Sequence, residues 1–289
     1  MRRFLFVAFT VGVAWFATDI ARAGDLHVPP HPVAGEAMTL GTTGQGDATL
    51  YLIGPAQVIK RQVRLGRDVQ VKAEELRSAG RWTAILRNGE HSESQTFWVS
   101  PGPPRNLNFL ARPSRVPVAR QHVISGVAFV FDQNQNLVLR PIPVKFTLSV
   151  DGSGASQTVE SRDGVAWINS SSAKKAGAAQ FVASVGETSV RRVVQQVASD
   201  PCNLRMHVVQ LNQKGVIVET DPIRDCTGNP VPDGTIVSFT QTDSTGRSTV
   251  DARIKNGVAR AQLPYAENAS ISVAAGVVLG NELRLGSQP

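Results

Sequence analysis

The chain has 289 residues, with 30 Lys and Arg against 23 Asp and Glu, so its formal net charge is +7. Hydrophobic residues make up 42% and charged residues 18%, which is typical of a globular protein and excludes a disordered or multi-spanning membrane chain. The 2 cysteines exclude a disulfide-dense scaffold and any zinc or iron–sulfur site built from four thiolates. With 25 Gly and 17 Pro, the chain is interrupted too often for long helices.

The first 23 residues have the features of a secretory signal peptide. Met1–Arg3 is a short cationic start, Phe4–Ala17 is an apolar run, and Ala21–Ala23 has the small-x-small pattern that signal peptidase requires. At about 1.5 Å per residue the apolar run spans roughly 21 Å, too short for the ~30 Å hydrocarbon core of a bilayer. We therefore expect cleavage after Ala23 and a periplasmic, extracellular or cell-surface mature chain without a membrane span. Export by the twin-arginine route is the open alternative.

The remaining sequence shows short strand patterns separated by proline-rich joints. Strand signals recur with turn residues between them and without a sustained helical period, which indicates antiparallel sandwiches. The predicted fold class is therefore all-β, a tandem array of three immunoglobulin-like β-sandwich domains after a cleaved signal peptide. Short proline joints act as stiff spacers, so we expect a rod-like array. We expect a proline-rich, mobile lead at 24–32 and sandwich domains at 33–100, 105–198 and 202–286.

The first expected domain has strand patterns at 48–53, 68–72 and 95–99. The segment Leu76–Leu86 resembles the corner that leads into the sixth strand of an immunoglobulin-like sandwich, with Trp82 where such domains often carry Tyr. An ordinary core position for Trp82 is equally compatible with the pattern.

The same domain carries a basic stretch that is a candidate for binding a partner. Such a stretch suits lipopolysaccharide, an acidic glycan or an acidic protein, and a solvated strand face is the alternative. Nucleic acid is not expected, because the chain is predicted to be exported and no aromatic residues alternate with the charges. The candidate residues are Lys60, Arg61, Arg64, Arg67 and Lys72.

Two of the expected domains are copies of one repeat. The motif residues Asp132, Val144, Phe146 and Gly164-Val165-Ala166 recur 93 residues later as Asp225, Val237, Phe239 and Gly257-Val258-Ala259. Diverged domains keep one register through several segments and slip in their loops. We therefore expect Phe146 to match Phe239 and Val165 to match Val258, with all four side chains pointing inward.

The two cysteines are expected to form a disulfide. If residues 203–211 and 216–223 are antiparallel strands joined by a turn at 212–215, paired positions place Cys202 opposite Cys226. The predicted export permits oxidation. Two free thiols are the alternative.

The third expected domain resembles a known repeat family. The run Asp225-Cys226-Thr227-Gly228-Asn229-Pro230-Val231-Pro232-Asp233-Gly234, followed by Val237-Ser238-Phe239 and Asn256-Gly257-Val258-Ala259, resembles bacterial Ig-like repeats of the invasin/intimin type. The second domain keeps Asp132, Pro143, Val144, Phe146 and Asp163-Gly164-Val165-Ala166, and departs from the pattern at 133–137 and 140–142. The resemblance covers about 105–285 and implies stalks, spacers and adhesin arrays outside the cytoplasm, without catalysis.

No motif for catalysis, a cofactor or a metal was found. The sequence has no H-E-x-x-H and no G-x-S-x-G. Asp132–Asn136 imitates the start of a calcium loop, but Leu137 and Pro143 stand where Gly and Glu belong, so an Asx turn is expected. Catalytic, cofactor and metal residues are therefore predicted as none.

These observations predict an exported, non-enzymatic structural or binding protein, adhesin-like or an envelope scaffold, whose partner is an envelope protein or a surface glycan. The alternative is a carbohydrate-binding or accessory subunit of an extracytoplasmic hydrolase or of a secretion or assembly system. A sugar platform would need exposed aromatic rings on one face. The candidates Trp82, Trp98 and Trp167 all lie at positions compatible with a core.

Overall fold

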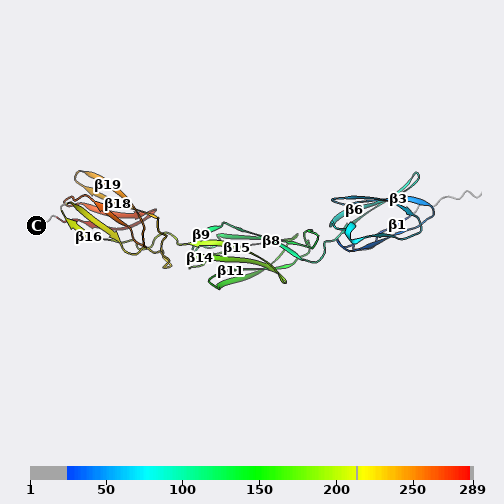
Figure 1. The fold of residues 1–289 in the computed structure, drawn as a ribbon, viewed down its shortest axis with the longest axis horizontal. Helices are drawn as coiled ribbons and strands as arrows, with labels where there is room; N and C mark the ends of the chain where they lie inside the picture. Colours follow the sequence, from blue (N-terminus) through cyan, green and yellow to red (C-terminus); the bar gives the residue numbers. More distant parts are fainter. Residues whose placement is uncertain (1–24, 213, 287–289) are drawn as a thin grey trace, which may run out of the picture. The chain divides into compact units, whose positions relative to one another are not determined.

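The computed structural model describes residues 25–212 and 214–286, and this part of the chain is all-β apart from one short 3-10 helix (Figure 1). These residues form two compact units, which divide between Gly102 and Pro103. The predicted signal peptide, residues 1–23, lies outside the described residues. Within the described ranges, no helix has the length and apolar character that crossing a bilayer takes.

The first unit is a sandwich of two antiparallel sheets around one hydrophobic core. Trp82 is fully buried in this core, and its Nε1 donates a hydrogen bond to the Ser78 carbonyl at 2.9 Å. The indole thus fills the core and is also hydrogen-bonded to the backbone four residues upstream. One sheet has the order β1 (Leu26–His27), β2 (Met38–Thr42), β5 (Val69–Val71), and the other β4 (Val58–Arg64), β3 (Asp47–Ile53), β6 (Gly80–Asn88), β7 (His91–Val99), with the 3-10 helix η1 at Ala73–Glu75.

The segment expected to be a mobile lead is part of this sandwich, so that expectation is wrong. Leu26 pairs with Thr42 in β2, and Leu26 and Val28 are both buried in the core. The Leu26 N–H also donates to the Glu93 carboxylate at 2.8 Å. The two alternating apolar residues of this short segment therefore place it in the core despite the prolines that follow.

The second unit contains two sandwiches, each with its own hydrophobic cluster. The first of them, called here the second sandwich, has sheets β13-β10-β8 and β12-β11-β14-β15-β9. The third sandwich has sheets β16-β17-β20 and β19-β18-β21-β22. The strands are β8 (Asn106–Arg112), β9 (Arg115–Pro117), β10 (Ile124–Phe131), β11 (Pro143–Val150), β12 (Ser153–Glu160), β13 (Val165–Ser170), β14 (Gly177–Val185), β15 (Thr188–Val197), β16 (Met206–Asn212), β17 (Gly215–Thr220), β18 (Ile236–Asp243), β19 (Gly246–Arg253), β20 (Arg260–Leu263), β21 (Ser270–Ala275) and β22 (Val278–Arg284).

The strands of these two sandwiches correspond as the repeat predicts. Phe146 in β11 pairs with Ala183 in β14, and Phe239 in β18 pairs with Val273 in β21. Both phenylalanine side chains are buried in the cores of their sandwiches. The two strands thus occupy equivalent positions.

The predicted inward orientation of Val165 and Val258 is wrong. Both valines are only partly buried, while the neighbouring Ala166 and Ala259 are fully buried. Successive side chains of a strand point to opposite faces, so the small alanine faces the core and the valine faces out.

Candidate functional site

The outer face of the sheet β4-β3-β6-β7 in the first unit carries four basic side chains, Lys60, Arg64, Arg81 and Arg87, here called the basic face. Strand pairing fixes this arrangement, since Gln62 in β4 and Arg87 in β6 both lie opposite Thr49 in β3. Residues two apart along a strand share a face, which brings Lys60 and Arg64 to the side that displays Arg81 and Arg87. All four basic side chains are exposed.

The basic face also has two aromatic side chains and little opposing charge. Lys60 Nζ lies 5.7 Å from the centre of the Tyr51 ring, a cation–π contact. Trp98 pairs with Arg81 across the strands and is 54% exposed. Asp47 is the one acidic residue at the outward positions of these four strands, and none of the four basic residues forms an ion pair with another described residue.

The structure divides the predicted basic stretch. Lys60 and Arg64 lie on the basic face, but Arg61 points to the other side of the sheet, where it pairs with Glu75 and donates to the Gln70 carbonyl at 2.7 Å. The hydrogen bond from Arg61 lowers the pKa of Glu75, with further lowering from the Lys72 N–H. Arg61 is therefore a structural residue rather than part of an open surface.

Arg67 and Lys72 lie apart from the basic face. Arg67 is exposed in the turn after β4, and its carbonyl accepts a hydrogen bond from the Thr42 hydroxyl at 2.8 Å. Lys72 precedes η1 and lies 3.9 Å from the Glu74 carboxylate. In their place the fold supplies Arg81 and Arg87, which sequence reasoning missed. In the sequence, Arg81 and Arg87 lie an even number of positions apart and alternate with the apolar Trp82, Ala84 and Leu86. This period-two pattern is the signal that could have placed both arginines on the outer face of a strand.

Two of the three tryptophans expected at core positions are exposed. Trp98 is 54% and Trp167 55% exposed, whereas Trp82 is fully buried. Trp98 belongs to the first unit and Trp167 to the second. The two exposed rings therefore belong to different sandwiches, and neither sheet face carries both.

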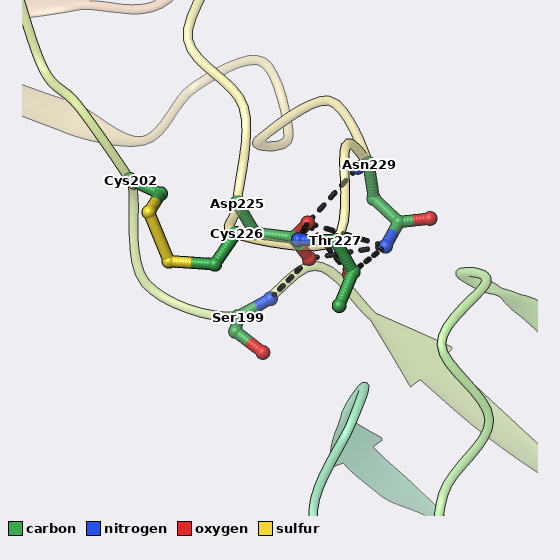
Figure 2. Close-up of a disulfide and its surroundings, with 6 residues drawn as sticks. All are labelled: Ser199, Cys202, Asp225, Cys226, Thr227 and Asn229. Carbon is green, nitrogen blue, oxygen red and sulfur yellow. Dashed lines mark hydrogen bonds between the residues drawn. A yellow bond between two sulfur atoms is a disulfide. The ribbon is translucent and has the colours of Figure 1, made fainter.

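The predicted disulfide between Cys202 and Cys226 is present, with Cα atoms 4.9 Å apart (Figure 2). Its register differs from the expected one. The pairing of β16 with β17 shifts at a bulge between Val208 and Gln210, and β17 ends at Thr220. The cysteines therefore lie beyond the ladder, next to a bridge between Pro201 and Asp225.

Asp225 organises the joint between the second and third sandwiches, where its buried carboxylate accepts several hydrogen bonds (Figure 2). Its Oδ2 accepts from the Ser199 N–H at 3.0 Å, and its Oδ1 accepts from the Thr227 hydroxyl at 2.8 Å and the Asn229 N–H at 2.9 Å. Burial alone would raise the pKa of Asp225, but the bonds from Thr227, Ser199 and Asn229 prevail and lower it to about 2.

The same motif connects the third sandwich to the second. Asn229 Nδ2 donates to the Lys174 carbonyl at 2.7 Å, and Asn229 Oδ1 accepts from the Ala176 N–H at 2.8 Å. The equivalent Asp132 accepts from the N–H groups of Asn134 and Asn136, so the Asx turn expected there is confirmed. The described residues contain no group of three or more His, Cys, Asp or Glu side chains that could hold a metal.

No protein-family model matches the sequence, and no curated protein matches it. Among solved structures, the FdeC adhesin of Escherichia coli is similar, with a TM-score of 0.62 and 14% identity, covering 92% of this chain and 97% of FdeC. Invasin, a bacterial integrin-binding protein, matches with a TM-score of 0.54 and 12% identity over 91% of this chain and 59% of its own. InvD of Yersinia pseudotuberculosis matches with a TM-score of 0.51 and 12% identity over 92% of this chain and 98% of InvD. The predicted resemblance is thus confirmed at the level of fold, and this chain has the Ig-like sandwich fold of the bacterial invasin-type proteins.

Proposed function

We propose that this chain is an adhesin-like binding protein, without catalytic activity, that acts in the periplasm or at the cell surface after cleavage behind Ala23. Its partner, in this proposal, is an acidic surface glycan that contacts the basic face. The similar structures of FdeC, an adhesin, and invasin, an integrin-binding protein, support a binding role.

The basic face is the observation that carries the proposal. Lys60, Arg64, Arg81 and Arg87 project from one face of one sheet, and Asp47 is the one acidic residue at the outward positions of its four strands. Repeated negative charges on an extended polymer match such a surface, and the attraction also steers the approach of the partner. The exposed Trp98 beside Arg81 offers an apolar surface against which a sugar ring can pack.

The test is the binding of the purified chain to immobilised heparin, an acidic polysaccharide, with dextran as the neutral comparison. Lys60→Glu with Arg64→Glu should weaken heparin binding by roughly tenfold or more, because two attractive contacts become repulsive. Arg61 is left unchanged in this variant, since its loss would break the contacts with Glu75 and Gln70.

Arg191→Glu with Arg192→Glu is the matched control. It changes the net charge by the same amount at exposed positions of β15 in the second sandwich. Heparin binding by this control should stay close to that of the unaltered chain. An equal loss in both variants would show that net charge alone drives binding and would contradict the assignment of the basic face.

A further inference from the structure

The outer face of the sheet β13-β10-β8 in the second sandwich carries six apolar side chains. Five of them, which lie in two adjacent rows, are here called the apolar patch, and the sixth, Phe131, pairs with Asn106 at the end of β10. Leu110, Val127 and Trp167 form one row across the three strands, because Val127 pairs with both of the others. Leu110 is 54% and Trp167 55% exposed. Phe129 and Val165 lie in the adjacent row on the same face and are partly exposed.

The third sandwich shows that this sheet does not need apolar residues there. Its equivalent row consists of His207, Glu219 and Arg260, and Arg260 follows Trp167 by the repeat spacing of 93 residues. Arg260 lies 3.9 Å from Glu219, and His207 Nδ1 lies 3.2 Å from Asp221. A charged, solvated row is therefore compatible with the same strand arrangement, and the fold alone does not account for the apolar row of the second sandwich.

We propose that the apolar patch is a self-association surface on which a second copy of this chain packs face to face. Exposed apolar patches with polar rims mark protein contact sites, and Trp is enriched where such contacts are strongest. A second copy related by a two-fold axis brings an identical patch, so the surface must be complementary to itself.

The row meets this requirement when the two-fold axis runs along β10. Val127 and Phe129 then face their own copies, and Trp167 of each chain lies over Leu110 of the other. A large ring thus meets a smaller aliphatic side chain on both sides. Apolar faces of two sheets pack in this way at a separation of about 10 Å.

The rim of the patch fits the same arrangement. Arg112 in β8 and Asn169 in β13 both pair with Ser125 in β10, so the three form the next row on this face. The two-fold axis places the guanidinium of Arg112, a donor, opposite the amide carbonyl of Asn169 in the second copy. Arg112 is the one charged residue in the three rows of this face, so like charges do not meet at its centre.

The patch is small for a permanent dimer. Five side chains are far fewer than the roughly 20–30 residues a side of a standard interface, so a weak and reversible dimer is expected. Sedimentation equilibrium of the full chain from about 5 to about 500 µM covers the range in which such a dimer forms. A salt concentration of about 0.15 M screens the repulsion between the two positively charged chains.

The variant carries Val127→Glu and Trp167→Arg, which reproduces two residues of the charged row of the third sandwich and is therefore compatible with the fold. The average mass of the unaltered chain should rise toward that of a dimer, and the variant should stay a monomer. Trp98→Arg, which alters an equally exposed tryptophan of the first unit, should associate like the unaltered chain. A monomeric unaltered chain throughout the range, or undiminished association of the double variant, would overturn the proposal.

Discussion

Asp225 lies at the start of the third sandwich, where its buried carboxylate holds the linker residue Ser199 and the turn residues Thr227 and Asn229. The pKa of about 2 in the folded chain lies below the ordinary value of 3.8. A depressed folded-state pKa contributes stability that is present above the ordinary value and is lost as the pH falls through the folded-state value. The contribution of Asp225 should thus be complete near neutral pH and vanish between about pH 4 and pH 2.

Asp225→Asn should destabilise the chain by about 2 kcal/mol at pH 7, because it removes the charge that these donors stabilise. The difference from the unaltered chain should disappear near pH 2. Urea denaturation followed by circular dichroism at both pH values measures this.

Asp243→Asn is the control for Asp225→Asn. Asp243 accepts from the N–H and hydroxyl of Thr245 in the same pattern, but in an exposed hairpin. Its substitution should change stability much less. If both substitutions lowered stability equally, burial of Asp225 at the joint would contribute no stability beyond that of an exposed turn.

Among the strands, β11 and β18 are the clearest evidence of the repeat, since each places one phenylalanine in the core of its sandwich. Phe146 belongs to an aromatic cluster, with ring centres 5.9 Å from Phe109 and 6.2 Å from Phe181. Phe239 packs in a core cluster of aliphatic residues. Phenylalanine thus occupies the same position in both sandwiches, but its neighbours in the core differ.

Phe146→Ala should cost roughly 3–5 kcal/mol, the range for a buried phenylalanine, and should leave a cavity beside Phe109 and Phe181. Hydrogen exchange read by mass spectrometry should show the loss of protection in 105–198 and little change in 202–286. Phe239→Ala is the reciprocal variant, with its loss confined to 202–286. Loss of protection across both ranges in either variant would contradict separate cores.

Strand patterns in the sequence predicted the all-β class and the repeat, but the faces of single strands needed the sheet itself. Val165 and Val258 were assigned inward from their match in the repeat, although period-two alternation fits either face until the paired strands are known. The cysteine pairing was right while its register was wrong, because the sequence shows neither the pairing of Asn212 with Gly215 at the turn nor the bulge between Val208 and Gln210. Leu26 and Val28 were missed because two apolar residues among prolines are too short a pattern.

The basic face was only half predictable for the same reason. Lys60 and Arg64 were found as part of a basic stretch in the sequence. Arg81 and Arg87 come from β6, which joins the same surface only because β3 lies between the two strands. Arg61 interrupts the run because alternate residues of β4 face opposite sides. A linear stretch of charge therefore translates into a surface only once the sheet order is known.

For the molecule as a whole, the two proposed surfaces lie on different units. The basic face belongs to the first unit and the apolar patch to the second, so partner binding and self-association can be tested by separate substitutions. The hydrogen bonds of Asp225 and Asn229 connect the two sandwiches of the second unit. The proposed ligand contact lies on the sheet formed by β3, β4, β6 and β7. Removing one surface should leave the other intact.

The salt dependence of heparin binding by the full chain tests most directly whether the basic face binds an acidic partner. Contacts between exposed charges weaken as salt shortens the screening length from about 14 Å near 0.05 M to about 4 Å near 0.5 M. The affinity for heparin should fall by roughly tenfold or more over this range, and dextran should not bind. Heparin affinity that does not change with salt, or equal binding of dextran, would contradict the claim that this chain captures an acidic partner through its basic face.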